Sequence, residues 1–255
     1  MSNPDLFRLD GHVAVVTGAG AGIGRGIATT FARAGAAVVV SDLKAEAAEA
    51  VASEIAQAGG KSVGVACDVT DEEKLQTLVD AATGEFGKLS LLVNNAGGGG
   101  PKPFDMPMTD FRRAYELNLF SVFRLTQLAA PHLAAAGDGA VLSISSMAGE
   151  NKNVRMASYA SSKAALNHLT RNIAFDLGAM GVRVNAIAPG AIRTHALATV
   201  LNPEVEKAML QHTPIRRLGE VEDIANAALF LCSPAASWIS GQILTVSGGG
   251  TQELD

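Results

Sequence analysis

The chain has 255 residues, of which 48% are hydrophobic and 18% charged, and its formal net charge is −5. This mild acidity, with Lys and Arg residues scattered along the chain, argues against a protein that binds nucleic acid or an anionic membrane surface. No apolar run reaches the roughly 20 residues of a membrane-spanning helix, and the first eleven residues are polar rather than signal-like, so we expect a cytoplasmic protein.

Short apolar, β-branched runs alternate with longer helical stretches along the whole chain. Most of these runs are continuously apolar, as in strands that are buried on both faces. The predicted strands are 12–17, 37–42, 62–67, 89–94, 139–144, 182–188 and 242–246. The predicted helices are 23–34, 44–58, 71–86, 111–135, 158–177 and 220–232. This alternation predicts an α/β fold with a Rossmann-type, doubly wound parallel sheet.

No Pro-rich, Ser-rich or like-charged stretch interrupts this pattern. Residues 1–255 are therefore expected to form a single domain. The two cysteines, Cys67 and Cys232, lie in apolar surroundings and are predicted to pack in the core rather than to form a disulfide. The sequence has no spacing typical of metal ligands, so we expect no metal site.

A glycine-rich turn follows the first predicted strand. Gly18, Gly22 and Gly24 have the spacing Gly-x-x-x-Gly-x-Gly, which differs from the strict Gly-x-Gly-x-x-Gly fingerprint. A strand that turns sharply into a helix, with backbone amides close to a pyrophosphate, needs residues without side chains. A flexible loop is the alternative. The position between a strand and a helix favours a dinucleotide site, in which we include Ile23.

Acidic residues end the second and third predicted strands. Asp42 lies about 20 residues beyond the glycine turn, where a carboxylate can accept hydrogen bonds from both hydroxyls of an adenosine ribose. It would also repel a 2′-phosphate, which predicts NAD rather than NADP, with the adjacent Leu43 in the same site. Asp68 and Val69 are predicted to meet the adenine. Both aspartates have an alternative role as caps of the helices that follow.

The fourth predicted strand ends in two Asn residues, an Ala and a Gly at 94–97. Asn side chains at a strand end can lock the neighbouring backbone while small residues let a cofactor pass, so Asn95 is predicted to line the cofactor site. The same composition is also typical of an ordinary turn.

Tyr159 and Lys163 lie four residues apart in a predicted helix, which places them on one face. A free Tyr has a pKa of about 10, and a nearby ammonium is expected to lower that pKa and so make a general base. Ser146 ends the fifth predicted strand, where it can hydrogen-bond a substrate oxygen beside Tyr159. The alternative is a surface Tyr–Lys pair. The glycine turn, Asp42 and Ser146 together favour catalysis.

Taken together, these residues resemble the short-chain dehydrogenase/reductase family over essentially the whole chain. The resemblance rests on Thr17, Gly18, Gly22, Gly24, residues 94–97, Ser146, Tyr159, Lys163 and Pro189-Gly190. It implies a catalytic tetrad of Asn118, Ser146, Tyr159 and Lys163. In the family, Tyr is the general acid/base, Ser polarises the carbonyl, Lys tunes Tyr and binds the nicotinamide ribose, and Asn supports a water-linked proton relay. Asn118 lies inside a predicted helix, where a polar residue fits a local distortion.

The resemblance also implies further contacts. In segment 189–194, the Ile192 backbone and the Thr194 hydroxyl would grip the nicotinamide carboxamide, with Arg193 between them. Relatives of this kind are usually homotetramers. Segments 97–108, 150–153, 211–217 and 247–250 are similar to those of family members that oxidise the 7α-hydroxyl of bile acids with NAD. That similarity places Gly99, Ser146, Asn151 and Tyr159 around the substrate.

Several interpretations stay open at this point. Phe104, Met106 and Met108 offer apolar surface suited to a steroid, although such a stripe is more often core. Residues 191–209 are predicted to form a mobile lid. The same chemistry could act on a 3-oxoacyl thioester or a sugar. A nucleotide-binding regulatory protein without turnover is disfavoured, because binding alone does not require the Tyr–Lys pair.

Overall fold

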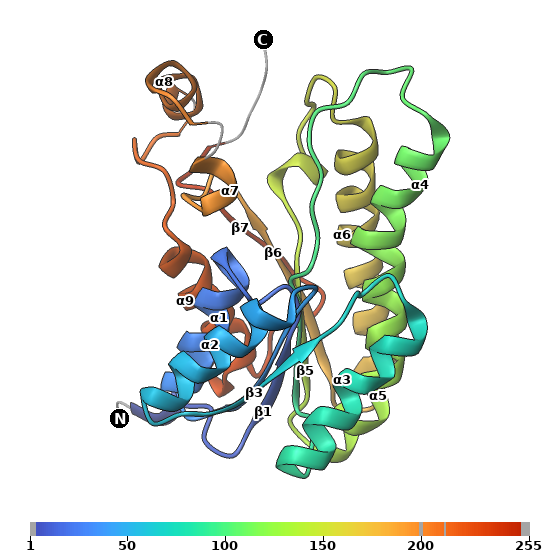
Figure 1. The fold of residues 1–255 in the computed structure, drawn as a ribbon, viewed down its shortest axis with the longest axis vertical. Coiled ribbons are helices and arrows are strands. Elements are labelled where there is room, and N and C mark those ends of the chain that lie inside the picture. Colours follow the sequence, from blue (N-terminus) through green and yellow to red (C-terminus); the bar gives the residue numbers. More distant parts are fainter. Residues whose placement is uncertain (1–3, 199–200, 212, 251–255) are drawn as a thin grey trace.

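Seven strands form one parallel sheet in the computed structural model, which describes residues 4–198, 201–211 and 213–250 (Figure 1). Their order is β3-β2-β1-β4-β5-β6-β7. The strands are β1 Val13–Val16, β2 Ala37–Asp42, β3 Lys61–Ala66, β4 Leu91–Asn94, β5 Ala140–Ile144, β6 Arg183–Pro189 and β7 Ile243–Val246. The order reverses between β1 and β4, and ligands of such sheets bind in the crevice beyond the strand ends at this point. The predicted doubly wound sheet is confirmed.

Helices cover both faces of the sheet. On one face lie α1 Gly22–Arg33, α2 Ala45–Gln57 and α9 Val221–Cys232. On the other lie α3 Glu72–Phe86, α5 Ser121–Ala136 and α6 Ala157–Gly178. The shorter elements are α4 Met108–Tyr115, α7 His195–Ala198, α8 Pro203–Gln211, the π-helical turn η2 Glu116–Phe120 and the 3₁₀ turns η1 Pro4–Phe7, η3 Met147–Gly149 and η4 Pro234–Ala236. Within the described residues, none of the helices has the length and apolarity needed to cross a bilayer.

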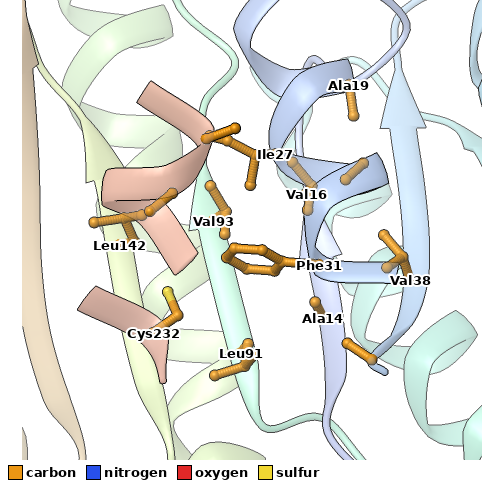
Figure 2. Packing of buried hydrophobic residues seen from close by; sticks show 14 of the residues in the cluster. Ala14, Val16, Ala19, Ile27, Phe31, Val38, Leu91, Val93, Leu142 and Cys232 are labelled. Carbon is orange, nitrogen blue, oxygen red and sulfur yellow. The ribbon is translucent and has the colours of Figure 1, made fainter. Parts of the chain in front are cut away.

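The sheet separates two hydrophobic cores, because successive strand side chains point to opposite faces. Ala14 and Val16 of β1 enter the core under α1 and α9, while the alternate valines of β1 enter the other core. Figure 2 shows Phe31 of α1 at the centre of the first core, with Cys232 of α9 in the same cluster. Cys67 belongs to the second core, so the sheet keeps the two free thiols apart. Their predicted role in core packing is confirmed.

The structure differs from the predicted elements in two places. The helix predicted at 111–135 begins earlier, at Met108, and the wider turn η2 divides it into α4 and α5. The expected lid, 191–209, contains the short helices α7 and α8, with residues 199–200 outside the described chain. Its predicted mobility stays a prediction. The edge strands β3 and β7 are partly exposed, because each has a neighbour on only one side.

Close packing of α1 against α9 requires a glycine at position 26. A Cβ at Gly26 would stand 2.1 Å from Val221 Cγ1, and a β-branched side chain rotates poorly out of the way. We expect Gly26→Ala to lower the free energy of unfolding by about 1–3 kcal/mol, the usual cost of overpacking, in urea titrations. The matched control is Gly84→Ala in α3, where a Cβ meets nothing within 4 Å. It should raise stability by about 0.5–1 kcal/mol. Equal effects of the two variants would contradict the packing argument.

Candidate active site

The turn between β1 and α1 leaves no room for side chains at its glycines. Gly18 has φ +60°, and a Cβ there would lie 2.9 Å from Ala96 Cα. A Cβ at Gly24 would lie 2.3 Å from the Gly18 carbonyl oxygen. The predicted glycine positions therefore permit a tight strand-to-helix turn, and the alternative of a loosely flexible loop does not fit this packing.

The N-terminus of α1 opens onto the site. The N-cap residue is Ala21, whose methyl side chain cannot accept a hydrogen bond from the first amides of the helix. The first amides of a helix lack partners within the helix, and together with the helix dipole they favour an anion such as a phosphate. Gly22, Ile23 and Gly24 of this first turn line a cavity.

The end of β4 is tied to the turn after β1. Asn95 donates from Nδ2 to the carbonyl oxygens of Thr17 (2.8 Å) and Gly18 (2.9 Å). The Thr17 hydroxyl accepts from the backbone amides of Asn95 (3.1 Å) and Ala96 (3.0 Å). Asn95 thus locks the backbone of both strand ends, as predicted, and this network holds the glycine turn in place.

Asp42 joins the glycine turn to the start of α2. Its Oδ2 accepts from the Gly20 amide at 3.0 Å, and its Oδ1 accepts from the Lys44 amide at 3.1 Å. Lys44 is the N-cap residue of α2, so Asp42 lies two residues before the cap. The carboxylate therefore sits beside the glycine turn with lone pairs left for further donors. The adjacent Leu43 is largely exposed.

Asp68 shapes the turn before α3. Its Oδ1 accepts from the Thr70 hydroxyl (2.7 Å) and the Thr70 amide (3.0 Å), and these bonds hold the pKa of the Asp68 carboxyl below its usual value. The cap of α3 is Asp71, which accepts from the Glu73 amide. The alternative role of Asp68 as the helix cap is therefore wrong. Val69 beside it is buried.

Tyr159 and Lys163 occupy one face of α6. Lys163 is only 4% exposed, its Nζ donates to the Ile144 carbonyl at 2.8 Å, and it lies 5.9 Å from the centre of the Tyr159 ring. Burial lowers the pKa of Lys163 to about 8, because the charged form is poorly solvated there. The alternative of an exposed Tyr–Lys surface pair does not hold.

Ser146 follows β5 and lies next to Tyr159. Its Oγ accepts from the Ala148 amide at 3.1 Å and is the N-cap of η3. Burial raises the pKa of Tyr159, and the hydrogen bond with Ser146 lowers that pKa in part. The expectation that Lys163 lowers this pKa below its ordinary value is therefore wrong for the protein alone. The physical reason is that desolvation of the phenolate outweighs the hydrogen bond.

Asn118 lies in the π-helical turn η2 and is completely buried. Its Oδ1 accepts from the Gly98 amide at 2.9 Å, and its Nδ2 donates to the Gly98 carbonyl at 2.9 Å. The helix distortion that its position indicated is present. The carboxamide holds the loop after β4 against α6.

The segment after β6 passes the same site. Ile192 forms a bridge with Gly219, and the Thr194 hydroxyl accepts from the Leu197 amide at the start of α7. The Arg193 guanidinium lies 3.0 Å from a Glu206 carboxylate oxygen. Its side chain is thus held by an ion pair, while Ile192 and Thr194 line the cavity.

One cavity of about 500 Å³ brings the helix N-terminus and the catalytic candidates together. Its lining includes Gly22, Asn95, Ser146, Tyr159, Lys163 and Thr194. A larger hollow of about 1010 Å³ lies along the outer side of α1 and contains none of the tetrad residues. We assign the chemistry to the smaller cavity, because a phenol, a hydroxyl and an amine meet there.

The predicted substrate residues differ in how closely they approach Tyr159. Gly99 has φ +153°, and a Cβ there would lie 2.6 Å from Tyr159 Cδ2, so only glycine permits this approach. Asn151 lies in the loop after η3, where its amide donates to the Met147 carbonyl at 3.0 Å. Phe104 and Met108 are strongly exposed, which disfavours the alternative that they belong to the core.

Two buried polar residues of α6 were not predicted. The Ser162 hydroxyl accepts from Asn118 Nδ2 at 3.1 Å, and Asn167 Oδ1 accepts from the Ser145 hydroxyl. Helical spacing gave part of this result. Ser162 lies three residues after Tyr159 and Asn167 lies four after Lys163, so these residues share one helix face. Their partners come from distant segments, which the sequence pattern does not reveal.

Comparison with known proteins agrees with this geometry. The family model described as Enoyl-(Acyl carrier protein) reductase matches residues 18–251. A structure described as a short-chain type dehydrogenase/reductase from Mycobacterium marinum superimposes with a TM-score of 0.93 at 35% identity, covering 98% of this chain and 100% of that one. The chain belongs to the short-chain dehydrogenase/reductase family.

Some relatives of this dehydrogenase are much more similar. The 7alpha-hydroxysteroid dehydrogenase of Escherichia coli strain K12 is 66% identical over 255 residues, which is 100% of both chains. A structure of 7 alpha-hydroxysteroid dehydrogenase complexed with NADH and 7-oxo glycochenodeoxycholic acid has a TM-score of 0.97 at 66% identity, again over 100% of both chains. Cis-4-hydroxycyclohexanecarboxylate dehydrogenase of Sinomonas cyclohexanicum is 42% identical over 94% of this chain and 96% of its own.

Proposed function

We propose that this dehydrogenase is an NAD-dependent 7α-hydroxysteroid dehydrogenase, which reversibly oxidises the 7α-hydroxyl of bile acids to the 7-ketone. One observation carries the assignment: the chain is 66% identical, over the full length of both chains, to a 7alpha-hydroxysteroid dehydrogenase. The fold is also nearly superimposable on a complex with NADH and a 7-oxo bile acid. The cavity holding Ser146, Tyr159 and Lys163 supplies the groups that such chemistry needs.

The residues present fit NAD. The uncapped amides of α1 and the crowded glycine turn suit a pyrophosphate. Asp42 has lone pairs left for the adenosine ribose, and the segment around Ile192 and Thr194 lines the far end of the site. When bound, NAD supplies the acceptor for the hydride that leaves carbon 7. The proposed cofactor contacts are those predicted from the sequence: Gly18, Gly22, Ile23, Gly24, Asp42, Leu43, Asp68, Val69, Asn95, Tyr159, Lys163, Ile192, Arg193 and Thr194.

The proton follows a separate route. In oxidation, the phenolate oxygen of Tyr159 takes the hydroxyl proton, while the Ser146 hydroxyl hydrogen-bonds the same substrate oxygen and holds it in place. Because burial raises the pKa of Tyr159 in the protein alone, its phenol is mainly protonated near neutral pH. The phenolate fraction grows as pH rises, so alkaline pH favours oxidation. In reduction, the neutral phenol is already the proton donor. Lys163, whose pKa is about 8, can exchange protons near neutral pH.

The steroid is proposed to lie over Gly99, Ser146, Asn151 and Tyr159. Gly99 has no side chain to collide with the Tyr159 ring, so the loop after β4 can pass close to the phenol and border the substrate. Exposed Phe104 and Met108 provide apolar surface nearby in sequence, and burying such surface against a steroid is favourable.

The substrate assignment and the role of Tyr159 are tested together by NADH absorbance assays with cholate, chenodeoxycholate and a 7β-epimer. We expect turnover of the 7α-hydroxyl compounds alone, because the hydride and the proton must leave from fixed positions. Tyr159→Phe should bind NADH normally and lose turnover by at least about 100-fold, the usual contribution of general acid/base catalysis. Turnover of a 3-oxoacyl thioester or a sugar, with none of a bile acid, would reject the steroid assignment.

Asp42 is proposed to select NAD over NADP. Removing its carboxylate takes away an acceptor for the ribose hydroxyls and the repulsion of a 2′-phosphate. Asp42→Ala should therefore weaken NAD and narrow the NAD/NADP preference by about tenfold or more, as one charged hydrogen bond is worth roughly 1.5–3 kcal/mol. Asp42→Asn is the matched control for the charge alone. Unchanged kcat/KM with both cofactors in Asp42→Ala would refute this role.

Exposed aromatic residues support assembly as a homotetramer. Phe175 on α6 and Trp238 before β7 are 88% and 98% exposed, and Phe120 in η2 is half-exposed. Large apolar side chains in such positions mark contact surfaces, and in the described chain β7 pairs only with β6. Sedimentation velocity should give a species of four 26.2-kDa chains. A monomer at micromolar concentration would reject the tetramer.

A further inference from the structure

The carboxamide of Asn118 is the starting point, because its orientation is strongly fixed. Its oxygen accepts from the Gly98 amide, and its nitrogen donates to the Gly98 carbonyl. The second proton of Nδ2 goes to the Ser162 hydroxyl at 3.1 Å. All these atoms belong to buried or half-buried residues, so water offers no easy substitute for a lost partner.

Ser162 can act only as an acceptor towards Asn118. It is completely buried, and its single hydroxyl proton is committed to the Tyr159 carbonyl at 2.7 Å. A hydroxyl has one proton to donate. Ser162 therefore accepts an N–H from Asn118 and rejects the flipped carboxamide, in which an oxygen would face it.

The orientation matters because the Asn118 oxygen and the Lys163 amine face the same point. A Cβ at Gly97 would lie 2.8 Å from Asn118 Oδ1 and 3.1 Å from Lys163 Nζ. Both polar atoms thus border the space beside Gly97, which lines the catalytic cavity. An oxygen at this position favours an ammonium, whereas an NH₂ group there would oppose it.

We propose that Ser162 is a positioning residue for proton transfer: it holds the Asn118 carboxamide with its oxygen towards Lys163 and ties that carboxamide to the turn of α6 that carries Tyr159. This inference rests on the roles proposed above for Tyr159 and Lys163. Ser162 is completely buried and is not among the residues that line the catalytic cavity. It acts through Asn118.

Loss of the hydroxyl has a definite physical consequence. In Ser162→Ala, one Nδ2 proton of Asn118 is buried without an acceptor, and the Tyr159 carbonyl loses a donor. The carboxamide then keeps only its two bonds to Gly98 and can tilt about them, so the oxygen beside Lys163 is held less firmly. A less stabilised ammonium supports the Tyr159 phenolate less well, which moves the acidic limb of the kcat profile for oxidation to higher pH.

The test compares Ser162→Ala with Ser161→Ala, using the full-length enzyme, NAD and cholate. Ser161 is the neighbour on the same helix, and its hydroxyl donates to the carbonyls of Ala157 and Ser158 in α6 itself. We expect kcat of Ser162→Ala to fall about 10- to 100-fold, as for a misplaced catalytic group, with the NADH dissociation constant changed less than about twofold. The acidic limb should shift by about half a pH unit or more. Ser161→Ala should keep the parent values.

A double-mutant cycle then separates positioning from a merely structural role. If Ser162 acts through Asn118, Ser162→Ala should cause no further loss of kcat in an Asn118→Ala background. An equal loss in both backgrounds would overturn the proposal, and so would a Ser162→Ala enzyme that matches Ser161→Ala. If Ser162→Ala does not fold, Ser162→Thr and Ser162→Val replace it, since they share a shape and differ in the hydroxyl. Equal kcat of that pair would overturn the proposal.

These failures are distinct from failure of the proposed function. If Tyr159→Phe keeps its activity, Tyr159 is not the general acid/base, and the proposed mechanism is rejected. An inactive Tyr159→Phe enzyme, together with a fully active Ser162→Ala enzyme, would leave the proposed function intact and remove only the role of Ser162.

Discussion

Burial of the Lys163 amine is the constraint around which the site is arranged. A long cationic side chain with 4% exposure is costly, and the cost is visible in a pKa lowered to about 8. The Ile144 carbonyl receives the amine at the end of β5. Space is made by glycines: a Cβ at Gly97 would crowd Nζ, and one at Gly149 would lie 2.8 Å from the backbone of α6 at Lys163. Glycines at these two positions thus allow the loop after β4 and the turn η3 to pack closely around Lys163.

Much of the fold follows from local pattern. Most strands are short and continuously apolar because helices cover both faces of the sheet, and the edge strands β3 and β7 are the more exposed ones. Runs of apolar residues that alternate with helical stretches were enough to predict all seven strands of the described chain. The glycine turn was equally readable, since close approach of Gly18 and Gly24 to neighbouring backbone excludes side chains. The roles of Asp42 and Asp68 were not settled by sequence. A carboxylate after a strand suits a turn, a cap or a ligand equally well. The sequence of residues 70–73 indicated an N-cap, and the structure assigns that cap to Asp71 rather than to Asp68.

Properties that depend on distant segments escaped prediction. Spacing placed Tyr159 and Lys163 on one face, but it did not give the degree of burial, and burial decides the direction in which the pKa of Tyr159 moves. The bond between Asn118 and Ser162 joins residues 44 positions apart. The position of Asn118 indicated a helix distortion, but nothing in the sequence indicated that Ser162 would be its partner. The short helices α7 and α8 were also missed, because mixed polarity over a few residues carries no clear period.

The π-helical turn η2 lies within the continuous helical segment from Met108 to Ala136 and affects its length. A π turn takes up one residue more than the α-helical path it replaces. The segment therefore contains an additional residue that does not lengthen its axis. Compared with an uninterrupted α-helix, the side chains of α5 are rotated relative to those of α4 by about 100°, the angle of one residue. A chain with one residue fewer at this point could keep both flanking helices in their places. What it would give up is the inward projection of the Asn118 carboxamide.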